Sequence, residues 1–161
     1  MPTATTQLPE TAMLADLSPW RYSRLAAALH WALALLLAGM VALGWFMMSV
    51  EDEPGSDWYF AQHKSVGILV ALLVLLRLIW RLANPPAPLP RSVPTWQARL
   101  ATFTQGGLYA LMVLMPLSGY LGASYSEHGV AVFGWPLPAW AAPDHDRAEQ
   151  FFDVHGALAW V

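Results

Sequence analysis

The chain has 161 residues, 57% of them hydrophobic and 12% charged, and a net charge of −3. A soluble domain usually carries about a quarter charged residues, so the composition indicates a protein that sits in a lipid bilayer. The chain has no cysteine and no basic stripe, which excludes disulfides, cysteine-ligated metal centres, covalently attached haem and a nucleic-acid partner.

Residues 1–20 are polar and rich in Thr and Pro, without the basic start and apolar core of a signal peptide. They predict a disordered cytoplasmic tail, and residues 21–161 then form one membrane domain. The first span covers Leu25–Val50, which contains no charge. A helix of this length is roughly 39 Å long, enough to cross a ~30 Å hydrocarbon core.

Two further apolar segments predict membrane spans. The second span covers Ala61–Leu82, keeps its charges near its ends, and stops where the proline-rich run NPPAPLP breaks any helix. The third covers Leu100–Ser124. It contains Pro116 and Gly119, which predict a kink of the kind that helices in a bilayer tolerate.

The last segment, Arg147–Val161, begins as a helix and is still running when the sequence ends. A helix over it is about 22 Å long, too short to cross the bilayer. We therefore expect that a longer natural chain is cut inside its fourth span. The predicted fold is all-α, a transmembrane four-helix bundle whose fourth helix is truncated in this chain.

Charged residues are divided between the two sides of the predicted bundle. The basic residues of one side are Arg21, Arg24, Arg77, Arg81, Arg91 and Arg99. The connections of the other side carry Glu51, Asp52, Glu53, Asp57, Glu127, Asp144, Asp146 and Glu149, with Arg147 as their only basic residue. Because loops rich in Lys and Arg stay in the cytoplasm, we expect a multi-pass inner-membrane protein with a cytoplasmic N-terminus.

Ionisable side chains are costly inside a membrane, so each one there is a candidate functional residue. His63, at the start of the second span, and His155, early in the fourth, share a depth near the outer surface. Two imidazoles on facing helices at one level can bind the two faces of a b-type haem. The alternative is that each histidine is only an interfacial or hydrogen-bonded helix residue.

His30 lies near the cytoplasmic end of the first span, on the other side of the membrane. A partner on the fourth helix would lie about four turns beyond His155, which is past Val161. We therefore expect two haems in the full-length protein and at most one fully ligated haem in this chain. His128 and His145 lie in the polar outer connection, where we expect them to be solvated.

Small and cationic residues near these histidines fit a haem as well. Gly67 and Gly156 leave room for a ring edge, although small residues also serve plain helix packing. Four cations at the levels of the histidines are candidates for contacts with haem propionates. They are Lys64 at the outer level and Arg24, Arg77 and Arg81 at the inner level. The same cations could instead anchor the helices at the interface.

Four segments resemble the bacterial cytochrome b561 family: RYSRLAAALHW (21–31), HKSVGILVALLVLLRLIWRLANPP (63–86), LYALMVLMPLSGYL (108–121) and DVHGALAWV (153–161). The second is the most specific, because hydrophobicity alone does not require the order His, Lys-Ser, twin arginines and prolines. The resemblance implies a di-haem cytochrome of the inner membrane, with His63 and His155 on the outer haem and His30 on the inner one. It also implies electron exchange with quinone, and one activity in the family is oxidation of superoxide with reduction of ubiquinone.

Several functional interpretations are compatible with these residues. Lys64 would attract superoxide or pair with propionates. The aromatic outer loop with Phe133, Trp135 and Trp140 either covers the haem edge or forms an interfacial belt. The protein could also be the cytochrome anchor subunit of a hydrogenase or another periplasmic dehydrogenase. A haem-free transporter with proton-relaying histidines is the alternative of another class, but the chain shows no internal repeat of the transporter kind.

Overall fold

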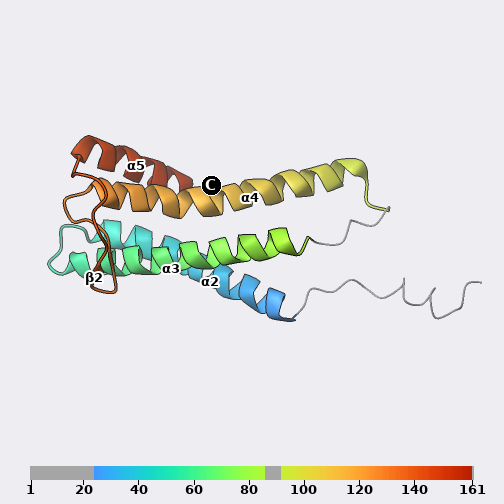
Figure 1. The fold of residues 1–161 in the computed structure, drawn as a ribbon, viewed down its shortest axis with the longest axis horizontal. Coiled ribbons are helices and arrows are strands. Elements are labelled where there is room, and N and C mark those ends of the chain that lie inside the picture. Colours follow the sequence, from blue (N-terminus) through green and yellow to red (C-terminus); the bar gives the residue numbers. More distant parts are fainter. Residues whose placement is uncertain (1–23, 86–91, 161) are drawn as a thin grey trace, which may run out of the picture.

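The computed structural model describes residues 24–85 and 92–160 (Figure 1). The predicted tail of residues 1–20 lies outside the described residues, as do Arg21, Arg91 and Val161. The described residues form four α-helices and one two-stranded antiparallel hairpin. The elements are α2 (Arg24–Ser49), α3 (Ser56–Ala83), α4 (Thr95–Tyr125), β1 (Ala131–Val132), β2 (Trp135–Pro136) and α5 (His145–Leu158).

The three longest helices are the predicted membrane spans. Helices α2, α3 and α4 have 26, 28 and 31 residues, and all three are long and apolar enough to cross a membrane. Large apolar side chains on them point outward, such as Leu35 (72% exposed), Leu76 (61%) and Phe103 (80%). An apolar solvent removes the cost of exposing them, so the expected all-α membrane fold is confirmed.

Helices α3 and α4 begin earlier than predicted, and local chemistry explains both starts. Gly55 adopts φ 90°, a left-handed turn that suits glycine, and the Ser56 hydroxyl donates to the Glu51 carbonyl at 2.8 Å. Pro94 is the N-cap of α4, and its carbonyl accepts the first hydrogen bond of the helix from the N–H of Ala98 at 3.1 Å. Helix α4 continues through Pro116 to Tyr125.

The helices alternate in direction, which separates a group of arginines at one end of the bundle from most of the acidic residues at the other (Figure 1). The start of α2, the end of α3 and the start of α4 lie toward one end, here called the arginine end. It carries Arg24, Arg77, Arg81 and Arg99. The opposite end, here called the acidic end, holds the α2–α3 connection, the hairpin and the start of α5. Its acidic residues are Glu51, Asp52, Glu53, Asp57, Glu127, Asp144, Asp146 and Glu149.

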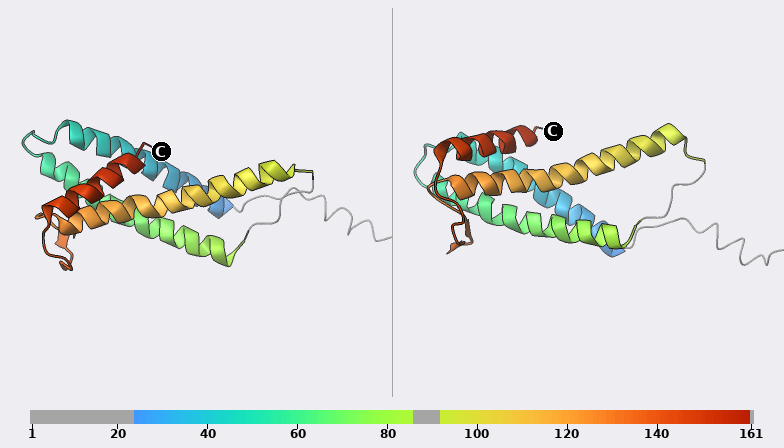
Figure 2. Two further views of the ribbon diagram at one scale, coloured as in Figure 1. Left: turned by 90° about the horizontal axis from the view of Figure 1, so that it is seen from above. Right: turned by 45° about the horizontal axis from the view of Figure 1, so that its top comes forward.

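Helix α5 lies against α4 and runs from the acidic end back toward the middle of the bundle (Figure 2). It has 14 residues and is about 21 Å long. The close approach of the two helices depends on small residues of α4. A Cβ atom at Gly122 would lie 2.7 Å from the Phe152 ring. Ser118 and Gly122, like Gly119 and Ala123, are small residues four positions apart, the spacing that lets membrane helices pack closely.

The hairpin was not predicted. Its register pairs Val132 with Trp135, so Phe133 and Gly134 form a two-residue turn. Both turn residues have positive φ, 47° and 88°, which is the pattern of a type I′ turn. Such turns usually carry Asn-Gly or Asp-Gly, and two-residue strands are too short to show an alternating pattern. The sequence therefore lacks the usual signals of a hairpin at this point.

Candidate functional site

Helices α3 and α5 bring His63 and His155 together. Their ring centroids lie 6.0 Å apart and their planes are at 88°. These are the two histidines that the sequence places at one depth. The other three histidines do not join them, because His30 lies toward the arginine end and His128 and His145 are exposed.

Helix α4 orients the ring of His155. The Nδ1 atom of His155 lies 2.8 Å from the Met115 carbonyl oxygen and 3.5 Å from the Ser118 hydroxyl. A carbonyl only accepts hydrogen bonds, so this contact assigns the proton to Nδ1 and leaves a lone pair on Nε2. Histidines that bind metals commonly use this arrangement, in which the ring donates its second N–H to a carbonyl or carboxylate.

The Nδ1 atom of His63 is buried and has no hydrogen-bond partner among the described residues. Buried polar atoms in proteins are nearly always paired. The unpaired nitrogen of His63, next to a second imidazole, therefore indicates that this ring has a neighbour that is not part of the polypeptide. The two rings, with centroids 6.0 Å apart, are close enough that both would contact one group held between them.

Two glycines lie against these rings: Gly119, which the sequence analysis connected only with a kink, and Gly44, which it did not select. A Cβ atom at Gly119 would lie 2.8 Å from both Cε1 and Nδ1 of His155, and one at Gly44 would lie 3.4 Å from Cε1 of His63. The predicted small residues are placed differently: a Cβ at Gly67 would meet Met40, and one at Gly156 would meet open space. The spacing of small residues around Gly119 was the only sequence signal for a glycine close to one of these rings. No sequence signal identified Gly44.

His30 has different surroundings at the arginine end. Its Nδ1 atom lies 3.4 Å from Nη2 of Arg77. A guanidinium only donates, so this contact assigns the proton to Nε2, the opposite tautomer to that of His155. Arg81 donates to the side chain of Gln105 at 3.0 Å, and Arg24 is exposed at the start of α2. No second histidine faces His30 among the described residues.

Lys64 is held by the segment that follows α4. Its Nζ atom donates to the Gly129 carbonyl at 3.3 Å. Next to it, Ser65 accepts a hydrogen bond from the backbone N–H of Phe133 at 2.8 Å. Ser65 thus contacts the hairpin, and Lys64 contacts the segment just before it.

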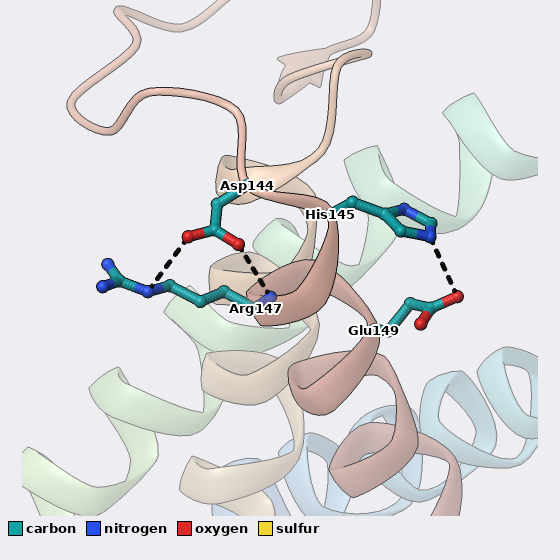
Figure 3. Close-up of polar contacts among 4 residues, drawn as sticks. All are labelled: Asp144, His145, Arg147 and Glu149. Atoms are coloured by element: carbon teal, nitrogen blue, oxygen red, sulfur yellow. Dashed lines mark hydrogen bonds and ion pairs between the residues drawn. The ribbon is translucent and has the colours of Figure 1, made fainter.

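The remaining histidines belong to a solvated surface, as predicted. His145 contacts Glu149 at 3.3 Å, and the two side chains are 82% and 65% exposed (Figure 3). Asp144 accepts from the backbone N–H of Arg147 at 3.1 Å and pairs with its side chain at 3.2 Å. These contacts cap the first turn of α5. In the described ranges, 24–85 and 92–160, no group of three or more His, Asp or Glu side chains could hold a metal ion.

Comparisons with known proteins agree with this arrangement. The sequence model of the family described as Prokaryotic cytochrome b561 matches residues 21–161. Cytochrome b561 homolog 2 of Escherichia coli (strain K12) is 36% identical over 149 residues, which cover 89% of this chain and 77% of the relative. The chain therefore belongs to the prokaryotic cytochrome b561 family, whose members are membrane electron-transfer proteins with b-type haem.

Proposed function

We propose that this protein passes electrons through a b-type haem held by His63 and His155, from a donor at the acidic end to ubiquinone in the membrane. The observation that carries the proposal is the meeting of the two imidazoles, with centroids 6.0 Å apart. Bound between two imidazoles, haem iron alternates between its ferric and ferrous states and so carries one electron at a time.

The chain's own residues have distinct parts in this proposal. His155 presents Nε2 because the Met115 carbonyl holds its Nδ1 at 2.8 Å. Gly119 leaves the space that the His155 ring fills, and Gly44 does the same for His63. Lys64 lies at the level of the pair, where its ammonium group could reach a propionate after leaving the Gly129 carbonyl.

A second haem at the arginine end is part of the proposal for the full-length protein. His30 would be one ligand, with a later histidine of the fourth helix as the other, as the family resemblance implies. Ligation through Nε2 requires Arg77 to leave Nδ1 of His30, since Arg77 now favours a proton on Nε2. Arg77, Arg81 and Arg24 would then be available for propionates. The described residues supply one complete imidazole pair.

We also propose an orientation in the inner membrane. The arginine end carries four described arginines, Arg24, Arg77, Arg81 and Arg99. By the positive-inside rule this end faces the cytoplasm, together with the N-terminus. The acidic end, with His63 and His155, then faces the periplasm, and ubiquinone exchanges from the lipid.

The charge of the acidic end favours one class of donor over another. Superoxide is an anion, and the carboxylates of this end repel it except close to Lys64. A cationic redox protein or the electron-transferring subunit of a periplasmic dehydrogenase is attracted instead. The role of a dehydrogenase anchor is therefore the second candidate. The dependence of the haem reduction rate on ionic strength distinguishes a cationic protein donor from superoxide. Added salt weakens the attraction of a cationic protein and slows reduction, whereas it does not slow reduction by an anion that the carboxylates repel.

A reduced-minus-oxidised visible spectrum with haem counted per chain tests the proposal. His63→Ala and His155→Ala should each remove the same low-spin b-type signal, because the two rings share one haem. The matched controls are His128→Ala and His145→Ala, which remove exposed histidines and should leave the spectrum unchanged. Retention of the full signal in either ligand variant would overturn the pairing.

A further inference from the structure

The segment between α4 and α5 contains a stretch without charge. Residues 130–143 include no Asp, Glu, Lys, Arg or His, although His128 and Asp144 lie close to its two ends. Its large side chains are exposed: Phe133 is 57% exposed and Trp135 78%. Contact with water would be unfavourable for these rings, so the exposed side of the hairpin needs an apolar or interfacial partner.

Two adjacent residues of α3 hold this hairpin in place. The Ser65 hydroxyl accepts from the N–H of Phe133 at 2.8 Å, and Lys64 donates to the Gly129 carbonyl at 3.3 Å. Ser65 is only 2% exposed. Figures 1 and 2 place the hairpin alongside the first turns of α3 instead of beyond its end. The hairpin is therefore held against the side of α3 by hydrogen bonds.

The position of Ser65 along α3 gives the depth of the hairpin. Helix α3 has 28 residues and is about 42 Å long at ~1.5 Å per residue. With a ~30 Å hydrocarbon layer centred on it, about 6 Å of helix projects at each end. Ser65 lies about 13 Å from the start of α3, and so ~7 Å inside the hydrocarbon boundary. The turn residue Phe133 is held at that level.

Backbone groups at this depth must be paired within the protein, because lipid offers no hydrogen bonds. Three pairings of hairpin backbone groups meet this requirement. The N–H of Leu137 donates to the Val130 carbonyl at 2.9 Å, and Val132 pairs with Trp135. The N–H of Phe133, at the tip, has no strand partner and is satisfied by Ser65. The buried Ser65 hydroxyl therefore allows the hairpin turn to enter the apolar part of the bilayer.

We propose that the hairpin is a lipid anchor, which lies in the headgroup and upper acyl region of the outer leaflet with Phe133 and Trp135 against phospholipid. The partner is the bilayer itself, at the same end of the bundle as the His63–His155 pair. Aromatic side chains concentrate at this level of membrane proteins because their rings suit the boundary between lipid and water. The inference does not depend on which residues bind haem.

Site-directed spin labelling tests the proposal directly, because the chain has no cysteine of its own. Trp135→Cys carries a nitroxide in the full chain reconstituted in phosphatidylethanolamine–phosphatidylglycerol vesicles. Collision with oxygen, which concentrates in lipid, should exceed collision with a water-soluble nickel complex several-fold. A label at Glu53→Cys, which is exposed in the acidic α2–α3 connection, should show the reverse order. Preferential collision with nickel at position 135 would overturn the proposal and leave the tip free in water for a soluble partner.

A second variant tests the attachment. Ser65→Ala removes the acceptor of the Phe133 N–H, and the label at position 135 should become several-fold more accessible to nickel. Ser124→Ala is the matched control. Ser124, like Ser65, donates to the carbonyl four residues earlier in its own helix, but among the described residues its hydroxyl makes no hydrogen bond to the hairpin. An unchanged label in Ser65→Ala would show that this hydroxyl does not set the depth, and the Trp135→Cys measurement alone decides whether the tip enters lipid.

Discussion

The Nδ1 atom of His155 lies 2.8 Å from the carbonyl oxygen of Met115. This contact and the 3.4 Å approach of Arg77 to Nδ1 of His30 assign opposite tautomers to two histidines of one bundle. At the acidic end the lone pair is on Nε2, and at the arginine end it faces Arg77. If His63 and His155 bind haem, the acidic end is already arranged for ligation and the arginine end requires Arg77 to move.

If His63 and His155 hold a haem, Ser118 should adjust its midpoint potential through the Met115 carbonyl. Its hydroxyl donates to that carbonyl at 2.8 Å and so competes with Nδ1 of His155 for the same acceptor. Ser118→Ala removes the competitor, which strengthens the His155 hydrogen bond and makes the ring a better electron donor to ferric iron. The midpoint potential should fall, by less than the ~59 mV of a tenfold change in a one-electron couple.

A redox titration followed by visible absorbance measures this shift. Ser124→Ala, which removes a similar hydroxyl from the same helix, should leave the potential unchanged. A rise in potential, or equal shifts in both variants, contradicts the role given to Ser118.

Gly119 is expected to tolerate no side chain. A Cβ atom there would lie 2.8 Å from two atoms of the His155 ring, a distance that forces the imidazole or α5 to move. Gly119→Ala should therefore lower haem content and the low-spin signal. Gly106→Ala on the same helix is the control, because nothing lies within 4 Å of its new Cβ and alanine favours a helix by roughly 0.5–1 kcal/mol over glycine. Normal haem content in Gly119→Ala would show that the His155 ring need not occupy this space.

The sequence predicted the parts of this protein that depend on the apolar solvent. Charge-free runs such as Leu25–Val50 correspond to membrane helices, and the proline-rich run after Asn84 separates α3 from α4. The depth of His63 and His155 followed from counting residues along spans. Distance along a helix is nearly constant per residue, so depth is the coordinate that a sequence reports best.

Contacts across the bundle could not be predicted in the same way. The acceptor for His155 is a backbone carbonyl, which every residue possesses, so nothing distinguishes Met115 in the sequence. Gly44 contacts His63 because of the rotation of α2 about its axis, which is set by packing. The hairpin was missed because a Phe-Gly turn lacks the usual residues. The types of side chain along a helix determine how deep each residue lies in the membrane. Tertiary packing determines which residues of neighbouring helices face one another.

The proposed orientation predicts which loops face the periplasm. Single cysteines at Glu53 and His128, both exposed at the acidic end, should react with a membrane-impermeant maleimide added to intact spheroplasts. A cysteine at Ser92, exposed just before α4 at the arginine end, should react only after the membrane is opened. The wild-type chain has no cysteine and supplies the blank. Labelling of Ser92→Cys alone in intact spheroplasts would reverse the topology and put the His63–His155 pair at the cytoplasmic face.

The last prediction concerns the start of α5, the helix that carries His155. Asp144 caps this helix by accepting from the N–H of Arg147 at 3.1 Å (Figure 3). Removing an aspartate cap costs about 0.5–2 kcal/mol. The nearby pair of His145 and Glu149 is exposed, and pairs of this kind on a helix contribute only about 0.3–0.5 kcal/mol. Asp144→Ala should therefore loosen α5, and Glu149→Ala should not.

The temperature at which the low-spin haem spectrum is lost measures the difference. Asp144→Ala should lower it clearly and Glu149→Ala only slightly, because fraying of α5 releases His155 from the Met115 carbonyl. Asp144→Asn keeps a capping oxygen but loses the charge that pairs with Arg147 at 3.2 Å. It should restore most of the loss if the cap is responsible. Equal losses in the Asn and Ala variants would instead assign the effect to the ion pair.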